Sequence, residues 1–346
     1  MHRKKWIYLF FVLAFFILLG TVLINYKIDS YRIFHNTYTN LYREPNQNYI
    51  KMNFLLHHKE RFHSFIFGSS RVGKLNPKHI NNETYYNMTY SEGLPLEHLE
   101  NIKLLLKSGI SIKNLLIGLD DFSYKLDPYA HLTQPMRLPH YKTDMNDMNS
   151  FQFYSYYLLR KPSSRDISKH SSHSHKKTYD FDIYHTGVPI VPQKIDDFIE
   201  SHKEEHIHDK KFLLPRTYVG DRMSKTLEEI QEIIEIAKKH NIHCTFFINP
   251  IQKTSYLALN QNSFQTFKYN LAKLTNFYDF SGLNTITTNN YYFYETSHYR
   301  TIVGDLILDR LLELSSKVPD DFGILVTQKN IKKHLENLEL QAKMYK

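Results

Sequence analysis

Two short segments, far apart in the sequence, carry side chains that could together perform nucleophilic chemistry. Ser70 lies in the sequence Gly-Ser-Ser-Arg (68–71), directly after the apolar run 64–67, a pattern typical of a buried strand followed by a turn. Near the other end of the chain, Glu295 precedes His298 by three residues, just ahead of an apolar helix. His298 would take the Ser70 proton as a general base, while Glu295 would hold the imidazole tautomer and stabilise its positive charge.

The same glycine turn also fits the first seven positions of the phosphate-binding loop G-x-x-x-x-G-K-[ST]. Residues 68–74 read Gly-Ser-Ser-Arg-Val-Gly-Lys, and 115–120 resembles an apolar strand that ends in a magnesium-binding Asp. The pattern fails at Leu75, where a hydroxyl is required, and at Pro77, which would break the helix whose N-terminus should hold the phosphates. We therefore favour the nucleophilic interpretation.

With these motifs in this order, the chain resembles the SGNH (GDSL-like) hydrolase superfamily over about residues 64–314, and most of all its membrane-anchored members of the bacterial cell envelope. The resemblance rests on the Gly-Ser-Ser-Arg turn, on Asp-Phe-Ser-Gly at 279–282 and on Phe-Tyr-Glu-Thr-Ser-His-Tyr-Arg at 293–300. It implies that Ser70 is the nucleophile, His298 the general base and Glu295 the acidic member of the triad, in place of the usual Asp.

The resemblance also implies donors for an oxyanion hole. The second block of the family contributes a glycine N–H, and residues 87–93 offer Gly93 and the Asn87 side chain at that place. The third block departs from the family, because Gly-x-Asn-Asp is replaced by Gly-Leu-Asp-Asp at 118–121. An ionised Asp120 would repel an oxyanion, so three alternatives are open: Asn87 takes over as the donor, Asp120 faces elsewhere, or the site is impaired as a catalyst.

The elements that must position these residues alternate between strands and helices. A capping box from Thr226 to Glu229 opens one of the helices. Apolar runs predict strands at 64–67, 114–119, 244–248 and 277–280, and helical periodicity predicts helices at 96–108, from 226 onward, up to about 273 and at about 299–314. This alternation predicts an α/β fold with a mainly parallel sheet covered on both faces. The family resemblance implies a flavodoxin-like three-layer αβα sandwich with its active site at the carboxyl ends of the strands.

The N-terminus predicts a membrane anchor. Residues 6–24 carry no charge and approach the ~20 apolar residues that are needed to cross a bilayer. The basic tail 1–5 precedes them, so the positive-inside rule places this tail in the cytoplasm and the rest of the chain outside. A cleaved signal peptide is the alternative, but the apolar run is longer than a typical h-region of ~7–15 residues and lacks an A-x-A site. We expect a single-pass protein of the cytoplasmic (inner) membrane with a periplasmic or extracytoplasmic domain.

The remaining chain divides into three parts. We expect a connector at 25–61, the SGNH-like domain at 62–320 and a C-terminal strand and helix extension at 321–346, with a polar insertion at about 125–216 that forms a lid over the sheet's rim. In this insertion His170, His173 and His175 could bind a metal, but they lie in a polar run without carboxylates, so we favour a solvated loop. We expect no metal and no cofactor.

Composition and resemblance together define the expected function. A net charge of +9 with 26 Tyr and 23 Phe favours anionic surfaces or polymers, or else reflects a solvated lysine-rich surface; we expect no nucleic acid partner. The family implies O-acyl groups on envelope or secreted polysaccharide as substrates, and therefore an O-acyl (acetyl) transferase or esterase, with a multipass membrane protein as a possible acyl donor. The alternative is a catalytically impaired SGNH-fold protein that binds glycans or acts as an assembly scaffold.

Overall fold

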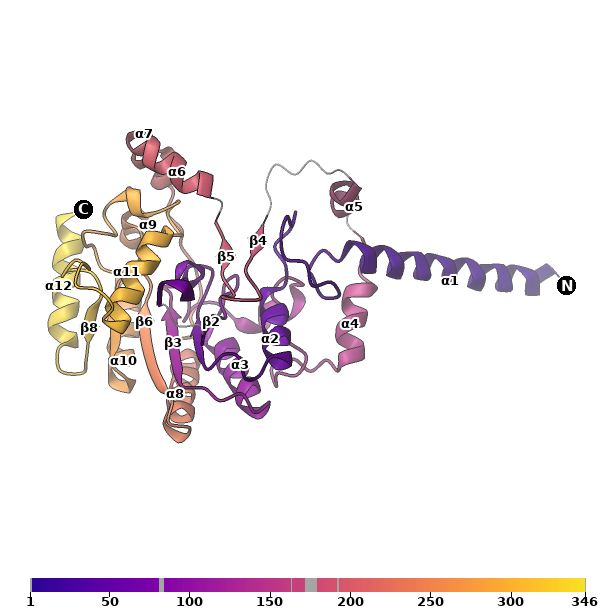
Figure 1. The fold of residues 1–346 in the computed structure, drawn as a ribbon, viewed down its shortest axis with the longest axis horizontal. Helices are drawn as coiled ribbons and strands as arrows, with labels where there is room; N and C mark the ends of the chain where they lie inside the picture. The colour runs from indigo at the N-terminus through magenta and orange to yellow at the C-terminus, as the bar shows by residue number, and fades with distance from the viewer. Residues whose placement is uncertain (1, 81–83, 163, 172–178, 192, 346) are drawn as a thin grey trace.

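The computed structural model describes residues 2–80, 84–162, 164–171, 179–191 and 193–345. A mostly parallel six-stranded sheet forms its centre, in the order β2-β1-β3-β6-β7-β8, and only β8 runs antiparallel to its neighbour (Figure 1). The strands are β1 (Ser64–Phe67), β2 (Tyr85–Asn87), β3 (Asn114–Leu119), β6 (His243–Ile248), β7 (Phe277–Asp279) and β8 (Ile324–Val326). The mainly parallel sheet predicted from the sequence is confirmed, and β2, a short edge strand, is added to it.

The register of the sheet brings the carboxyl ends of its strands to one edge. Phe67 at the end of β1 pairs with Ile117 on β3, and Leu119 at the end of β3 pairs with Ile248 at the end of β6. Ile248 pairs in turn with Asp279 at the end of β7. The loops that follow these four strands therefore meet along a single edge of the sheet.

Helices cover both faces of the sheet, and successive strand residues feed opposite cores. Phe65, Phe67 and Ile117 belong to the larger core, whereas Ile66 and Leu116 belong to a second core on the other face. Buried side chains of α2 (Gln47–His57), α3 (Pro95–Lys107), α8 (Met223–Lys239) and α10 (Gln261–Leu274) belong to the larger core. Buried side chains of α11 (Thr301–Leu312) belong to the second core. Strands buried on both sides read as continuous apolar runs, which explains why they were visible in the sequence.

Part of the predicted connector at 25–61 belongs to the folded domain. Residues Gln47–His57 form α2, whose first turn is capped by Asn46, since its side chain accepts a hydrogen bond from Tyr49 N. Ile50 and Leu55 are buried in the larger core. Lys51 is buried as well and donates to the Thr89 carbonyl at 2.5 Å. Buried polar residues of this kind interrupt the apolar periodicity from which a helix is predicted, so the sequence did not indicate α2.

The predicted capping box at the start of α8 is wrong. The helix begins at Met223, three residues earlier, and Thr226 lies buried within it. The Thr226 hydroxyl donates to the Ser123 carbonyl at 3.2 Å, and Glu229 forms an ion pair with Arg222. Both side chains of the supposed box therefore have other partners.

The polar insertion at about 125–216 is largely folded. Leu138, Phe153 and Phe181 from this segment are buried in the larger core. Its described elements are η3 (Pro128–Thr133), α4 (Ser150–Leu158), α5 (Ser164–Ser171), the antiparallel pair β4 (Asp180–Phe181) and β5 (Pro189–Ile190), α6 (Gln193–Ser201), α7 (Lys203–Ile207) and η4 (Lys210–Leu213).

The C-terminal extension contains β8 and α12 (Ile331–Met344), and this helix docks on the domain. Ile331 and Leu338 are buried, and α12 packs against α10. His334 Nε2 lies 2.8 Å from Asp279 Oδ2, and Asp279 also pairs with Lys268 at 2.8 Å. A buried polar cluster at the end of β7 therefore fixes the helix to the sheet.

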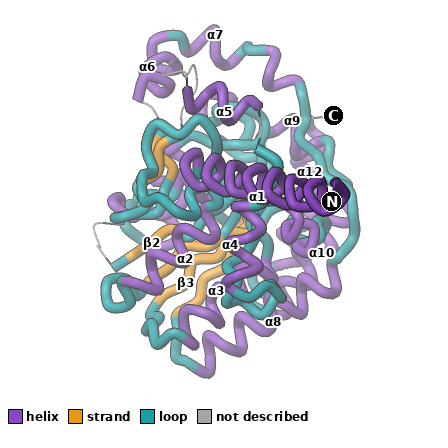
Figure 2. Tube along the Cα trace, turned by 90° about the vertical axis from the view of Figure 1, so that its right-hand side faces the viewer, coloured by secondary structure: helices purple, strands orange, loops and turns teal. Residues whose placement is uncertain are grey.

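The N-terminal helix α1 (His2–Ile28) projects alone from the domain (Figure 1). Within the part of the chain that the structure describes, it is the one helix long and apolar enough to cross a membrane. Asn25 near its end donates to the carbonyls of Leu158 and Arg160 at 2.8 and 2.7 Å. Figure 2 shows α1 in front of the domain, with α4 and α5 beside its base.

Candidate active site

Ser70 lies in a sharp turn at the end of β1. A Cβ atom at Gly68 would lie 2.3 Å from Val72 Cγ2, so only glycine lets the chain double back against itself at this point. The turn continues as the short 3-10 helices η1 (Val72–Lys74) and η2 (Pro77–Ile80). The α-helix that a phosphate-binding loop would require does not follow in these described residues, so the geometry favours the nucleophilic interpretation of the turn.

The structure brings Ser70, His298 and Glu295 into one hydrogen-bonded chain. Ser70 Oγ lies 2.9 Å from His298 Nε2, and His298 Nδ1 lies 2.5 Å from Glu295 Oε1. The serine and the histidine come from opposite ends of the sequence, yet each nitrogen of the imidazole faces the partner that a general base needs. The structure thus brings together the three residues that the sequence singled out, and their catalytic roles stay a prediction.

A tight loop explains the spacing of three between the acid and the base. Phe293 and Tyr299 form an antiparallel bridge, which closes the loop between them. The Glu295 carboxylate accepts hydrogen bonds from the backbone N–H groups of Ser297 (2.8 Å) and His298 (2.9 Å). Burial raises the pKa of Glu295, but the hydrogen bonds from His298 and the two backbone N–H groups outweigh it, and the pKa lies below its ordinary value. The carboxylate is therefore held ionised and oriented.

Beneath this relay, the buried Arg71 joins three segments of the site. Its Nη1 donates to Asp120 Oδ1 at 2.9 Å and to Asp121 Oδ1 at 2.8 Å, while its Nε donates to the Ser297 carbonyl at 2.9 Å. Burial acts to lower the pKa of Arg71, but the two carboxylates raise it above its ordinary value. Arg71 thus ties the Ser70 turn to the loop after β3 and to the loop of His298, a role that sequence reasoning missed.

Asp120 faces Arg71, which matches the second of the three alternatives left open by the sequence. Its side chain is buried, and its Oδ1 also accepts a hydrogen bond from Asn249 Nδ2 at 3.1 Å. Burial raises the pKa of Asp120 above its ordinary value, although the Arg71 guanidinium opposes this. The pairing with Arg71 directs the Asp120 carboxylate to the guanidinium and offsets its charge.

Asn87 is not placed as an oxyanion donor, and that prediction is corrected. Its Nδ2 donates to the carbonyls of Val72 and Leu75 at 2.9 and 2.8 Å, and its Oδ1 accepts from Thr89 N. Both amide hydrogens are therefore used to hold the chain that leaves the Ser70 turn. A local signal existed, since short buried asparagines beside turns often satisfy backbone groups.

Gly93 lies against the Ser70 turn. A Cβ atom at Gly93 would lie 2.7 Å from the Gly68 carbonyl oxygen. The Gly93 N–H donates to the Tyr90 carbonyl at 3.2 Å, whereas the Ser70 N–H has no hydrogen-bond acceptor among the described residues. The backbone of the turn itself is thus the better placed source of an oxyanion donor, and the role of Gly93 stays a prediction.

A cavity of about 310 Å³ opens over the relay. The insertion contributes Arg137 and Arg216 to its wall, and these arginines were not predicted from the sequence. Arg137 Nη1 pairs with Glu92 Oε2 at 2.7 Å. The residues that line the cavity are Ser70, Arg71, Ser91, Glu92, Phe122, Arg137, Arg216, Tyr218, Glu295, Ser297 and His298.

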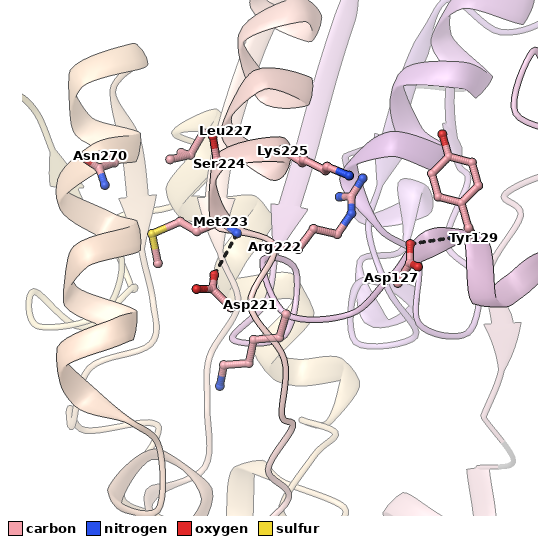
Figure 3. Close-up of a pocket in the computed structure, with 10 residues that line it drawn as sticks. Asp127, Tyr129, Asp221, Arg222, Met223, Ser224, Lys225, Leu227 and Asn270 are labelled. Carbon is pink, nitrogen blue, oxygen red and sulfur yellow. Dashed lines mark hydrogen bonds between the residues drawn. The ribbon is translucent and has the colours of Figure 1, made fainter.

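A larger cavity of about 920 Å³ lies beside the start of α8 and is shown in Figure 3. Its carboxylates serve the local backbone, because Asp221 accepts from Met223 N at 3.2 Å and Asp127 accepts from Tyr129 N at 3.1 Å. Arg222 is paired with Glu229. Among the described residues, no histidine or cysteine lines this cavity, so we place the candidate active site in the smaller cavity at Ser70.

Within the described residues, no group of three or more His, Cys, Asp or Glu side chains is arranged to hold a metal ion. Of the three histidines considered in the insertion, His173 and His175 lie outside the described residues, and only the backbone of His170 is described. Comparison with known proteins gives no further guide: no protein-family model matches the chain, and no curated protein is significantly similar to it.

Proposed function

We propose that this protein is a serine-dependent O-acyl (acetyl) esterase or transferase that acts on envelope or secreted polysaccharide outside the cytoplasmic membrane. The observation that carries the proposal is the relay in which Ser70 Oγ, His298 and Glu295 are joined by contacts of 2.9 and 2.5 Å. The fold we assign to it is the flavodoxin-like αβα sandwich of the SGNH superfamily. The order β2-β1-β3-β6-β7 supports this assignment, since it corresponds to the 2-1-3-4-5 order of flavodoxin-like sheets.

The chemistry follows from the relay. As Ser70 Oγ attacks the acyl carbonyl carbon, His298 Nε2 takes the hydroxyl proton, and the new oxyanion can be stabilised by the Ser70 N–H. Collapse of the tetrahedral intermediate breaks the bond to the sugar oxygen, which receives the proton from His298, and leaves an acyl-Ser70 ester. Water or a second sugar hydroxyl then attacks that ester with the same proton movements in reverse, which gives hydrolysis or transfer respectively.

The proposed location rests on α1. Basic residues at positions 3–5 precede its apolar stretch, and this favours a cytoplasmic N-terminus and an exported domain. Acyl-CoA donors are scarce outside the cytoplasm. A transferase would therefore take its acyl group from another ester, or from a multipass membrane partner that delivers it.

One observation favours the second candidate, a glycan-binding or scaffold protein without turnover. In this structure neither Asn87 nor Asp120 offers a donor toward Ser70, because both side chains are engaged elsewhere. The loss of one oxyanion donor costs ~3–4 kcal/mol of transition-state stabilisation in comparable hydrolases. Activation of Ser70 is therefore the property that separates the two candidates.

The test is labelling of the full-length protein in detergent with a fluorophosphonate probe, which reports an activated serine without knowledge of the substrate. We expect wild type to be labelled on Ser70, Ser70→Ala to be unlabelled, and His298→Ala to be labelled at least ~10³-fold more slowly. Ser91→Ala is the matched control, since Ser91 lines the same cavity outside the relay, and it should be labelled like wild type. A folded wild-type protein that does not react would support the scaffold instead.

A further inference from the structure

Among the charged side chains that line the cavity over Ser70, those other than Arg216 are paired. Arg71 faces two carboxylates, Arg137 pairs with Glu92, and Glu295 pairs with His298. Arg216 is exposed and has no carboxylate within ion-pair distance in the part of the chain that the structure describes. The Arg216 guanidinium is therefore available to pair with a ligand in the cavity.

Arg216 is nevertheless held in place. Its Cζ lies over the Tyr218 ring, 5.5 Å from the centroid, and its Nε donates to the Tyr218 hydroxyl at 3.3 Å. The backbone N–H of Arg216 donates to Ser255 Oγ at 2.9 Å. The hydrogen bond to Tyr218 raises the pKa of Arg216, and the carboxylates of Glu92 and Glu295 add to this across the cavity. The hydrogen bond to Tyr218 uses the Nε side of the guanidinium, and its terminal nitrogens Nη1 and Nη2 are left for a ligand.

The wall behind Arg216 is aromatic. The rings of Tyr218 and Phe122 pack with their centroids 4.6 Å apart, and both residues line the cavity. An aromatic surface offers an apolar face to a sugar ring. A guanidinium beside such a surface recognises a carboxylate through two parallel N–H···O bonds.

We propose that the substrate is an acidic polysaccharide, and that Arg216 binds a sugar carboxylate near the ester that Ser70 attacks. This inference rests on the proposed function. Lysine would supply the charge without the planar fork, so the geometry of Arg216 is specific for a two-oxygen anion. Because Arg216 is exposed, its attraction for the polymer should weaken as salt is added. Arg216 positions the substrate and has no part in the proton transfers.

The test measures how soluble polymers protect Ser70 of the full-length protein from the fluorophosphonate probe. We expect polygalacturonate to slow the labelling of wild type, and dextran, a neutral polymer, to leave it unchanged at equal sugar concentration. A poly(glycerol phosphate) arm separates a carboxylate preference from a general affinity for anions. Equal protection by this polymer would overturn the carboxylate assignment.

With protection measured against its own labelling rate without polymer, Arg216→Gln should need on the order of tenfold more polygalacturonate than wild type for the same protection. Lys332→Ala, an exposed residue on α12, is the matched control for the loss of one positive charge and should behave like wild type. Equal protection of wild type and Arg216→Gln would overturn this inference and leave the relay intact. Absence of labelling in wild type without polymer would instead refute the proposed function.

Discussion

The sharpest prediction concerns His131, whose proton links the insertion to the rim of the site. His131 is buried, with its Nδ1 2.9 Å from Glu97 Oε1 and its Nε2 3.9 Å from Glu92 Oε2. Burial acts to lower the pKa of His131, but the carboxylates of Glu97 and Glu92 raise it to about 9. An unfolded chain would have a pKa of ~6.5, and the difference corresponds to about 3 kcal/mol of stability.

The raised pKa of His131 determines how the stability changes with pH. The folded state holds the His131 proton more tightly than the unfolded state does. The stabilisation is therefore complete below pH ~6.5 and is lost as the pH rises through about 9. The assay is denaturant unfolding of the full-length protein in detergent from pH 6 to 10, for wild type and for His131→Gln, which cannot titrate. The difference between them should shrink by about 3 kcal/mol over this range. A difference that stays constant with pH would refute the assigned protonation.

Glu295→Gln should slow fluorophosphonate labelling of the serine by roughly 10³–10⁴-fold, because an amide cannot hold the imidazole tautomer; labelling at the wild-type rate would exclude Glu295 from the relay. Arg71→Met should lower the free energy of unfolding by about 3–5 kcal/mol, since it leaves two buried carboxyls without their cation; a thermal-shift assay that shows no change would contradict this. Burial lowers the pKa of His98 and of His140 to about 3, so the fold favours their neutral forms and its stability should be lost as the pH falls from ~6.5 toward 3. An equal denaturant midpoint at pH 7 and pH 4.5 would refute the effect.

The strands were predictable because most residues along them are apolar. The prediction for β1 and β3 matches the structure residue for residue, and that for β6 and β7 differs by one residue at one end. The start of α8 was misplaced, because Thr226 and Glu229 imitate a capping box while their side chains serve tertiary contacts. Helix α2 was missed because polar residues such as Lys51 are buried among its apolar ones. Local sequence does not reveal that a lysine has a carbonyl partner 38 residues away.

In the site, too, residues that share one loop were predictable from the sequence, whereas contacts between distant segments were not. Glu295 and His298 share a loop, and Ser70 follows a strand, so each half of the relay was visible in the sequence. Arg216 could not be recognised, because nothing in its neighbourhood in the sequence relates it to Ser70 or to the cavity that both line. Asn87 was misassigned because its spacing from the turn fits a donor, whereas its amide hydrogens are used by Val72 and Leu75.

Arg71 explains why two aspartates follow β3 at positions 120 and 121. A guanidinium buried directly after Ser70 needs negative partners, because an unpaired buried cation would cost several kcal/mol. Asp120 and Asp121 provide them at 2.9 and 2.8 Å, whereas an asparagine at position 120 would leave Arg71 with a single carboxylate. Arg71 of the turn and the two aspartates after β3 therefore form one buried ion cluster. Because the same Arg71 also donates to the carbonyl of Ser297, the residue before His298, the charged cluster helps to fix the loop that carries His298.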